Sequence, residues 1–184
     1  MLEVDPYAAL QALRPVGTFQ LTSADFADGE PLPLALRSGG QGAGDRSPQL
    51  SWSGFPAGTA SFTVTSLDPD APTGSGWWHW AVANIPPTVT SLPPGAGEAG
   101  GFRLPPGALV LGNETGEHRY AGSAPPPGSG VHRYFFVVTA LDVPRLDLDP
   151  DATPAVLGGR AFSHTLARGI LVGTAVHPAD AGIR

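Results

Sequence analysis

The sequence predicts a mainly β fold, an antiparallel sheet domain with short peripheral helices. Short segments in which apolar and polar residues alternate recur along the chain, as in half-buried strands. Gly and Pro account for 25 and 21 of the 184 residues and separate these segments, as turns do in all-β proteins. Residues 134–141 form a continuous β-branched and aromatic run, which is typical of a central strand buried on both faces.

Length and composition set the first limits on function. We expect residues 1–184 to form one domain with a substantial core. The formal net charge is −6, and all ten basic residues are Arg. Without a basic stripe, neither nucleic acid nor an anionic membrane surface is predicted as a partner. The absence of Cys excludes disulfides and thiolate metal sites.

The start of the chain, residues 1–5, lacks the basic region and the apolar stretch of a signal peptide. No segment approaches the roughly 20 apolar residues that a membrane-spanning helix needs. The expectation is therefore a cytoplasmic protein with no transmembrane segment.

The first half of the chain reads as one helix followed by strands. The helix is predicted at residues 6–13, where Tyr7, Leu10 and Leu13 recur at helical spacing. Alternation then predicts five strands. These are expected around Phe19 and Leu21, over Leu32, Leu34 and Leu36, at 50–52, at 60–67 and at 80–85.

Polar and Gly- or Pro-rich stretches are predicted as loops. They cover residues 39–47, 91–107 and 120–130, and a short apolar segment at 109–111 lies between the last two.

The C-terminal part is predicted as a helix and a strand. Thr153 is placed to be the N-cap of the helix, and Pro154 its first residue. The glycines at 158–159 should weaken or break the helix, and Gly169 is placed to end it. Residues 170–174 would then form the last strand.

Ionisable and aromatic residues gather at the ends of the predicted strands. Asp68 and Asp70 follow one strand, His79 lies near the start of the next, and His132 and Tyr134 open the strongest strand. His132 and Tyr134 are two residues apart and share a face, so they offer two donors to an anionic oxygen. Brought together by a β fold, these residues would line a small polar pocket suited to a phosphate or carboxylate group.

Each of these residues also has a structural interpretation. Asp68 and Asp70 could stabilise a rigid Asp-Pro turn through nearby backbone N–H groups. His79 could be a hydrogen-bonded histidine of the core, and strand alternation places it on the face opposite both Trp78 and Trp80.

A series of motifs runs through most of the chain in a characteristic order. They are Ser47-Pro48-Gln49-Leu50-Ser51-Trp52, Asp68-Pro69-Asp70-Ala71-Pro72, His79, Asn84-Ile85-Pro86, Gly112-Asn113, Tyr120 to Gly128, His132-Arg133-Tyr134 and Ser163-His164-Thr165-Leu166. Together they resemble the phosphatidylethanolamine-binding protein family, in its bacterial Raf-kinase-inhibitor-like branch. The resemblance covers about residues 19–174 and implies a β-sandwich with short flanking helices.

The resemblance also implies a ligand site. Its residues would be Asp68, Asp70, Trp77, His79, Ala124, Pro126, His132 and Tyr134. In the family, the positions of His79, His132 and Tyr134 line an anion pocket, so the two aspartates are expected to orient these groups. Arg133 points away from His132 on a strand and is interpreted as a structural ion-pairing residue. Ser123-Ala124 departs from the commoner family pattern, which leaves the backbone shape of the rim open.

The predicted function is a binding module without a cofactor or metal. Its ligand would be phosphate, a phosphorylated or carboxylated small molecule, or a lipid head group, and the family's regulators of kinases and proteases imply a protein partner. Two alternatives stay open. One is a metal- or histidine-dependent hydrolase that uses the same pocket, and the other is a homodimeric scaffold built on Trp77, Trp78 and residues 91–107.

Overall fold

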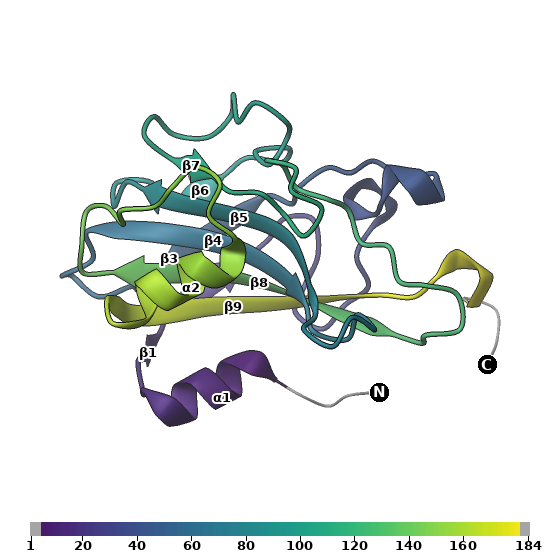
Figure 1. Cartoon of the computed structure of the whole chain (residues 1–184), viewed down its shortest axis with the longest axis horizontal. Coiled ribbons are helices and arrows are strands. Elements are labelled where there is room, and N and C mark those ends of the chain that lie inside the picture. Colours follow the sequence, from purple (N-terminus) through teal and green to yellow (C-terminus); the bar gives the residue numbers. More distant parts are fainter. Residues whose placement is uncertain (1–4, 181–184) are drawn as a thin grey trace.

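The structure, a computed structural model, describes residues 5–180 as two packed β-sheets with helices at the periphery (Figure 1). The larger sheet has six strands in the order β1-β9-β8-β4-β5-β7, and the smaller has the order β2-β3-β6. The strands are β1 Gly17–Thr18, β2 Gln20–Thr22, β3 Leu50–Ser53, β4 Ser61–Asp68, β5 Trp77–Ile85, β6 Ser91–Leu92, β7 Leu109–Val110, β8 His132–Leu141 and β9 Thr165–Ala175. The prediction of a mainly antiparallel β-sandwich is confirmed, and β1, which runs parallel to β9, is an added edge strand.

Two α-helices and three short 3-10 helices complete the described chain. They are α1 Pro6–Leu13, α2 Pro154–Phe162, η1 Leu34–Leu36, η2 Gly39–Gln41 and η3 Pro178–Asp180. Asp5 caps α1 by accepting hydrogen bonds from two backbone N–H groups, and Thr153 caps α2 as the sequence predicted. No helix within residues 5–180 is long and apolar enough to cross a membrane.

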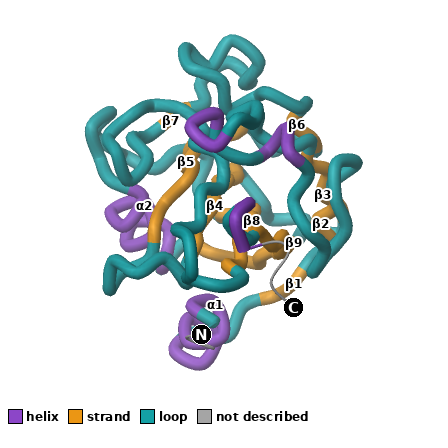
Figure 2. The backbone as a smooth tube through the Cα atoms, turned by 90° about the vertical axis from the view of Figure 1, so that its right-hand side faces the viewer, coloured by secondary structure: helices purple, strands orange, loops and turns teal. Residues whose placement is uncertain are grey.

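The main core lies between the two sheets. β8 contributes Phe136 and Val138 to this core, while Phe62 of β4 packs edge-on against Trp52 of the small sheet at 5.5 Å. A second apolar cluster lies on the opposite face of the large sheet, under α2, where Leu157 is buried. The small sheet and α2 therefore cover opposite faces of the large sheet (Figure 2). Because β8 lies between them, its side chains are buried on both faces, as its continuous apolar run predicted.

One predicted strand is instead a 3-10 turn. Leu32 and Leu36 are buried and Leu34 is exposed, so the alternation is real, but Leu34–Leu36 is η1. The prolines at positions 31 and 33 have no N–H to donate to a sheet ladder, so the segment makes only an isolated bridge to β9.

The helix and strand boundaries near the C-terminus also differ from the prediction. The helix α2 runs through both glycines and ends at Phe162, and β9 begins at Thr165. Gly169 therefore lies inside β9 rather than at a helix end. A Cβ atom added to Gly169 would lie 2.7 Å from the Phe19 ring, so the strand passes close to this side chain. Antiparallel pairing with almost the whole length of β8 determines this longer strand.

Candidate functional site

A cavity of about 510 Å³ opens where β4 ends and where β5 and β8 begin, beneath the loop of residues 120–130. Seven of the eight predicted ligand-binding residues line it. They are Asp68, Trp77, His79, Ala124, Pro126, His132 and Tyr134. Residues separated by more than 60 positions in the sequence thus meet at one end of the large sheet, because β4 lies between β5 and β8.

Asp68 and His132 form a buried pair in the wall of the cavity. The Nδ1–H group of His132 donates to Oδ2 of Asp68 at 2.8 Å, and both side chains are almost fully buried. The other carboxylate oxygen accepts the backbone N–H of Asp70 at 2.9 Å. Nε2 of His132 lies 2.8 Å from the hydroxyl of Ser129. Asp68 therefore orients His132, as the sequence predicted for an aspartate beside the pocket.

A β-bulge directs His79 into the cavity. The pairing of β4 with β5 shifts between Ser66 and Leu67, which leaves His79 as an extra residue between Trp78 and Trp80. The prediction that His79 faces away from Trp78 holds, since Trp78 lines a cavity on the opposite face of the sheet. The prediction that it also faces away from Trp80 is wrong, because Trp80 lies in the inter-sheet core, as does Tyr134, against whose ring His79 packs.

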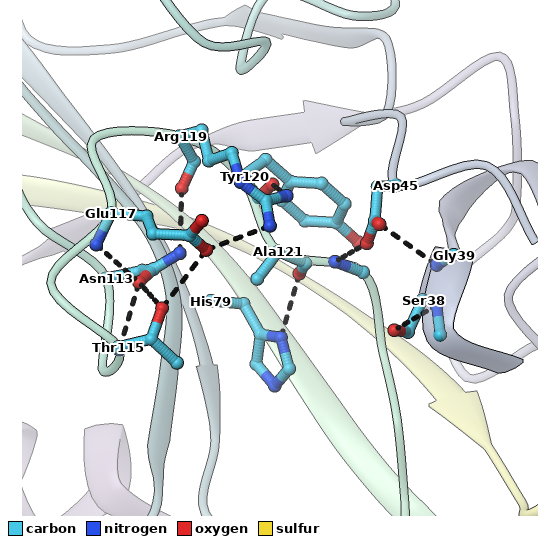
Figure 3. A network of polar contacts seen from close by, with 12 residues as sticks. Ser38, Gly39, Asp45, His79, Asn113, Thr115, Glu117, Arg119, Tyr120 and Ala121 are labelled. Carbon is cyan, nitrogen blue, oxygen red and sulfur yellow. Dashed lines mark hydrogen bonds and ion pairs between the residues drawn. The ribbon is translucent and has the colours of Figure 1, made fainter.

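The tautomer of His79 follows from its hydrogen bond to the backbone of Ala121. Nδ1 lies 2.8 Å from the carbonyl oxygen of Ala121, which only accepts, so Nδ1 carries a proton (Figure 3). Burial of the imidazole lowers its pKa from the usual 6.5, and the carbonyl of Ala121 and the charge of Asp68 offset this only in part. At neutral pH the ring is therefore neutral, and Nε2 is left to interact with a ligand.

Tyr134 presents an unused donor to the same space. Its hydroxyl is buried and makes no close hydrogen bond with a described residue, although the Asp68 carboxylate and the Ala124 backbone lie near enough to affect its pKa. Its ring packs edge-on against the ring of His79, with centroids 5.1 Å apart. Burial raises the pKa of Tyr134 far above its usual value, and the charge of Asp68 raises it further. The phenol consequently keeps its proton and remains a hydrogen-bond donor.

Asp70 is the predicted site residue that the structure separates from the others. It does not line the cavity. Oδ2 accepts the backbone N–H and the Nε–H of Arg133 at 2.9 and 2.8 Å, and Oδ1 accepts Nη2–H at 2.7 Å. Burial alone would raise the pKa of Asp70, but these bonds outweigh it and hold the pKa below 3.8. The interpretation of Arg133 as an ion-pairing residue is confirmed, and Asp70 fixes the strand beside the site.

Three charged residues of the cavity were missed in the sequence. Asp45 accepts the N–H groups of Gly39 at 3.0 Å and Gly122 at 2.8 Å, and so ties two loops together at the rim (Figure 3). Glu117 and Arg119 line the neighbouring wall and form an ion pair of 2.8 Å. All three lie in loops that lack periodicity, and only their charge distinguishes them from ordinary turn residues.

The loop that closes the cavity is tightly packed at one point. A Cβ atom on Gly122 would collide with the backbone of Arg37, which bridges to Ser123. Ala124 and Pro126 follow on the exposed side of this loop and form the rim. Within residues 5–180, no three His, Cys, Asp or Glu side chains gather closely enough to hold a metal ion.

Comparison with known proteins identifies the family. The model of the phosphatidylethanolamine-binding protein family matches residues 22–176. Two proteins of Escherichia coli strain K12, YbcL and YbhB, are each 47% identical to this chain. The match to YbcL spans 142 residues, which are 76% of this chain and 78% of YbcL. The match to YbhB spans 150 residues, which are 80% of this chain and 94% of YbhB. The chain therefore belongs to the phosphatidylethanolamine-binding protein family, in the bacterial branch of YbhB and YbcL.

Solved structures agree with this assignment. The crystal structure of E. coli YbcL superposes with a TM-score of 0.82 at 42% identity, covering 86% of this chain and 98% of that one. The structure of CT736 from Chlamydia trachomatis gives a TM-score of 0.72 at 32% identity, with coverages of 87% and 98%. The sandwich described above is thus the fold of the family.

Proposed function

We propose that this chain is a binding protein whose cavity takes the phosphate-bearing head group of a small molecule or phospholipid. The observation that carries the proposal is the Tyr134 hydroxyl, buried without a partner among the described residues and facing the cavity. An unsatisfied buried donor is costly, and a ligand oxygen would satisfy it.

Other donors lie around the same space. Arg119 lines the cavity, and its Nη1 and Nη2 donate to the Tyr120 carbonyl and to Glu117. Nε2 of His79 becomes a further donor when a bound anion favours the imidazolium. These groups supply charge-assisted hydrogen bonds to a phosphate.

The carboxylates of the cavity favour a zwitterion over a simple anion. Asp45, Asp68 and Glu117 all line the cavity; Asp68 is paired with His132 and Glu117 with Arg119, so Asp45 is the carboxylate of the cavity without a cationic partner among the described residues. A lone phosphate would be repelled by Asp45, whereas an ammonium group would be attracted. Phosphoethanolamine carries both charges, so we infer that it binds more tightly than inorganic phosphate.

The alternative function is that of a hydrolase, and the arrangement of three side chains favours it. Ser129, His132 and Asp68 form a chain with two distances of 2.8 Å, the order of a nucleophile, a base and an orienting acid. The hydroxyl of Ser129, however, also donates to the carbonyl of Pro126 at 2.7 Å, which directs its proton away from the imidazole. We propose binding rather than catalysis, and expect no labelling of Ser129 by a fluorophosphonate; stoichiometric labelling would favour the hydrolase.

The broader biological role is proposed from the family and the sequence. The family suggests a regulatory action on a kinase or protease and a homodimer, and the sequence patterns suggest a cytoplasmic location. Light scattering tests the dimer, cell fractionation tests the location, and affinity capture with and without phosphoethanolamine tests for a protein partner whose binding depends on the occupied cavity.

The direct test is calorimetric titration with phosphoethanolamine, inorganic phosphate and ethanolamine. We expect one site per chain, with phosphoethanolamine binding most tightly, and about a tenfold loss in Tyr134→Phe, because one hydrogen bond to a charged group is removed. Equal affinity of the wild type and Tyr134→Phe would contradict the proposal, as would the absence of saturable binding.

A further inference from the structure

A second cavity lies on the other face of the large sheet. It has a volume of about 460 Å³, within the range of roughly 300–1,000 Å³ that is usual for small-molecule sites. Residues of α1 and α2 line its sides, and residues on the outward face of β4, β8 and β9 line its floor. Figure 1 shows where these two helices lie relative to the large sheet. The large sheet separates it from the cavity that contains His79 and Tyr134.

Most of this cavity is apolar. Its walls include Leu10 of α1, Trp78 of β5, and Leu157 and Phe162 of α2. Its floor is less apolar, because Thr63, Thr65 and Thr139 contribute small hydroxyl side chains. These threonines leave room above the sheet, where larger aliphatic residues would fill the space under the helices.

Arg168 is the cationic residue that lines this cavity. It lies on β9 opposite Thr139 of β8 and is only 8% exposed. Its guanidinium makes no hydrogen bond or ion pair with any described residue, and Nη1 is buried without a partner. A buried guanidinium normally has a carboxylate or several carbonyl oxygens around it, and no described residue supplies such an anionic partner to Arg168.

The surroundings of Arg168 increase the positive potential. Arg14 lies nearby and lowers the pKa of Arg168, although burial has the larger effect in the same direction. Nη1 of Arg14 itself donates to the carbonyls of Phe162 and Thr165 at 2.9 and 2.7 Å. No Asp or Glu within residues 5–180 lines the cavity. The Tyr7 phenol would raise the pKa of Arg168 if it were ionised, but burial raises its own pKa, so that it stays neutral.

We propose that this second cavity binds a carboxylic acid with an apolar body, such as a medium-chain fatty acid. The carboxylate would lie against the guanidinium of Arg168, whose planar fork matches a carboxylate with two parallel hydrogen bonds. The hydrocarbon chain would lie along the apolar walls, next to Trp78 and Leu157. Because the cavity offers one cation, Arg168, and otherwise apolar walls, it should favour a singly charged carboxylate with a hydrocarbon chain over a phosphate, which is more strongly hydrated.

The experiment compares octanoate with octanol, which has the same chain without the charge, on the full-length protein. By calorimetry, octanoate should bind at one site and at least tenfold more tightly than octanol. In Arg168→Met, octanoate should fall to the affinity of octanol, and the affinity for octanol should be unchanged. Arg168→Lys should restore part of the preference for the acid. Arg160→Met, at an exposed position on α2 away from the cavity, is the charge-matched control and should behave as wild type.

Two neighbouring tryptophans locate the ligand. Trp78 lines this cavity and Trp77 lines the other one, so octanoate should shift the indole N–H signal of Trp78 and leave that of Trp77 in place. Phosphoethanolamine should do the reverse, which separates this proposal from the proposed function. The melting temperature of Arg168→Met should equal or exceed that of the wild type, because an unpaired buried charge is removed. The proposal is overturned if octanoate shows no saturable binding, or if Arg168→Met keeps the wild-type affinity for it.

Discussion

Nδ1 of His132 lies 2.8 Å from Oδ2 of Asp68 in the wall of the cavity, with 1% and 4% of the two side chains exposed. The same pair of residue types occurs on the surface, where Nδ1 of His164 lies 2.9 Å from Oδ1 of Asp142 with 39% and 47% exposed. The two pairs share their geometry and differ in burial. Comparing them isolates what burial contributes to this contact.

We expect Asp68→Asn to lower the free energy of unfolding by about 2 kcal/mol, because the buried imidazole loses a charged acceptor. Asp142→Asn should cost less than about 1 kcal/mol, since solvent screens the exposed pair. Urea unfolding at pH 7 measures both values. Similar costs for the two variants would mean that burial of Asp68 and His132 adds nothing to their interaction.

Two buried tyrosines provide a second comparison. Tyr120 donates its hydroxyl to the carbonyl of Leu36 at 2.8 Å, whereas the hydroxyl of Tyr134 has no partner among the described residues. Tyr120→Phe should therefore cost about 1–2 kcal/mol in thermal or urea unfolding, and Tyr134→Phe should cost nothing or stabilise the fold. A loss in Tyr134→Phe as large as in Tyr120→Phe would show that the Tyr134 hydroxyl is satisfied within the protein.

The affinity of the cavity for anions should rise as pH falls. His79 is neutral in the free protein because burial lowers its pKa below 6.5, and a bound anion favours its protonated form. Binding then takes up a proton, so affinity increases as pH decreases and levels off below the pKa of the free protein. Sulfate is the suitable probe, since its charge is constant over this range. A pH-independent affinity in the wild type, or the same slope in His79→Gln, would exclude His79 as the titrating group.

The same histidine should make stability depend on pH. Its folded pKa is lower than its unfolded value of about 6.5, so the unfolded state binds more protons as pH falls below that value. The stabilisation from neutral His79 is complete above pH 6.5 and is lost on acidification, with a slope of at most about 1.4 kcal/mol per pH unit. Unfolding curves between pH 7.5 and 5 should be flatter for His79→Gln; parallel curves would contradict this assignment.

Glycine substitutions should act in opposite directions at two positions. Gly122→Ala places a Cβ atom against the Arg37 backbone at the rim of the cavity, and should cost about 1–3 kcal/mol. Gly158→Ala adds a Cβ atom in open space within α2, and should stabilise the helix by about 0.5–1 kcal/mol. Differential scanning calorimetry measures both shifts. A neutral Gly122→Ala would show that the rim can move away from this contact.

The residues of the candidate site that lie at the ends of strands could be predicted from the sequence. His132 and Tyr134 share a face by strand periodicity alone, and the structure brings both to the cavity. Asp70 could not be separated from Asp68 in the sequence, because which carboxylate reaches Arg133 depends on how the turn after β4 folds back. Arg119 could not be found, because its place in the cavity results from packing of an irregular loop.

Local patterns in the sequence determined the parts of the fold that depend on neighbouring residues. The first helix, the Thr153 cap and the two-sided burial of β8 follow from spacing, capping and β-branched composition, whose effects extend over a few residues. Only the tertiary structure decided the rest. The bulge that turns His79 inward, the full length of β9 and the unpaired burial of Arg168 all arise from pairing between distant strands, where the register of one strand fixes the side-chain directions of the other.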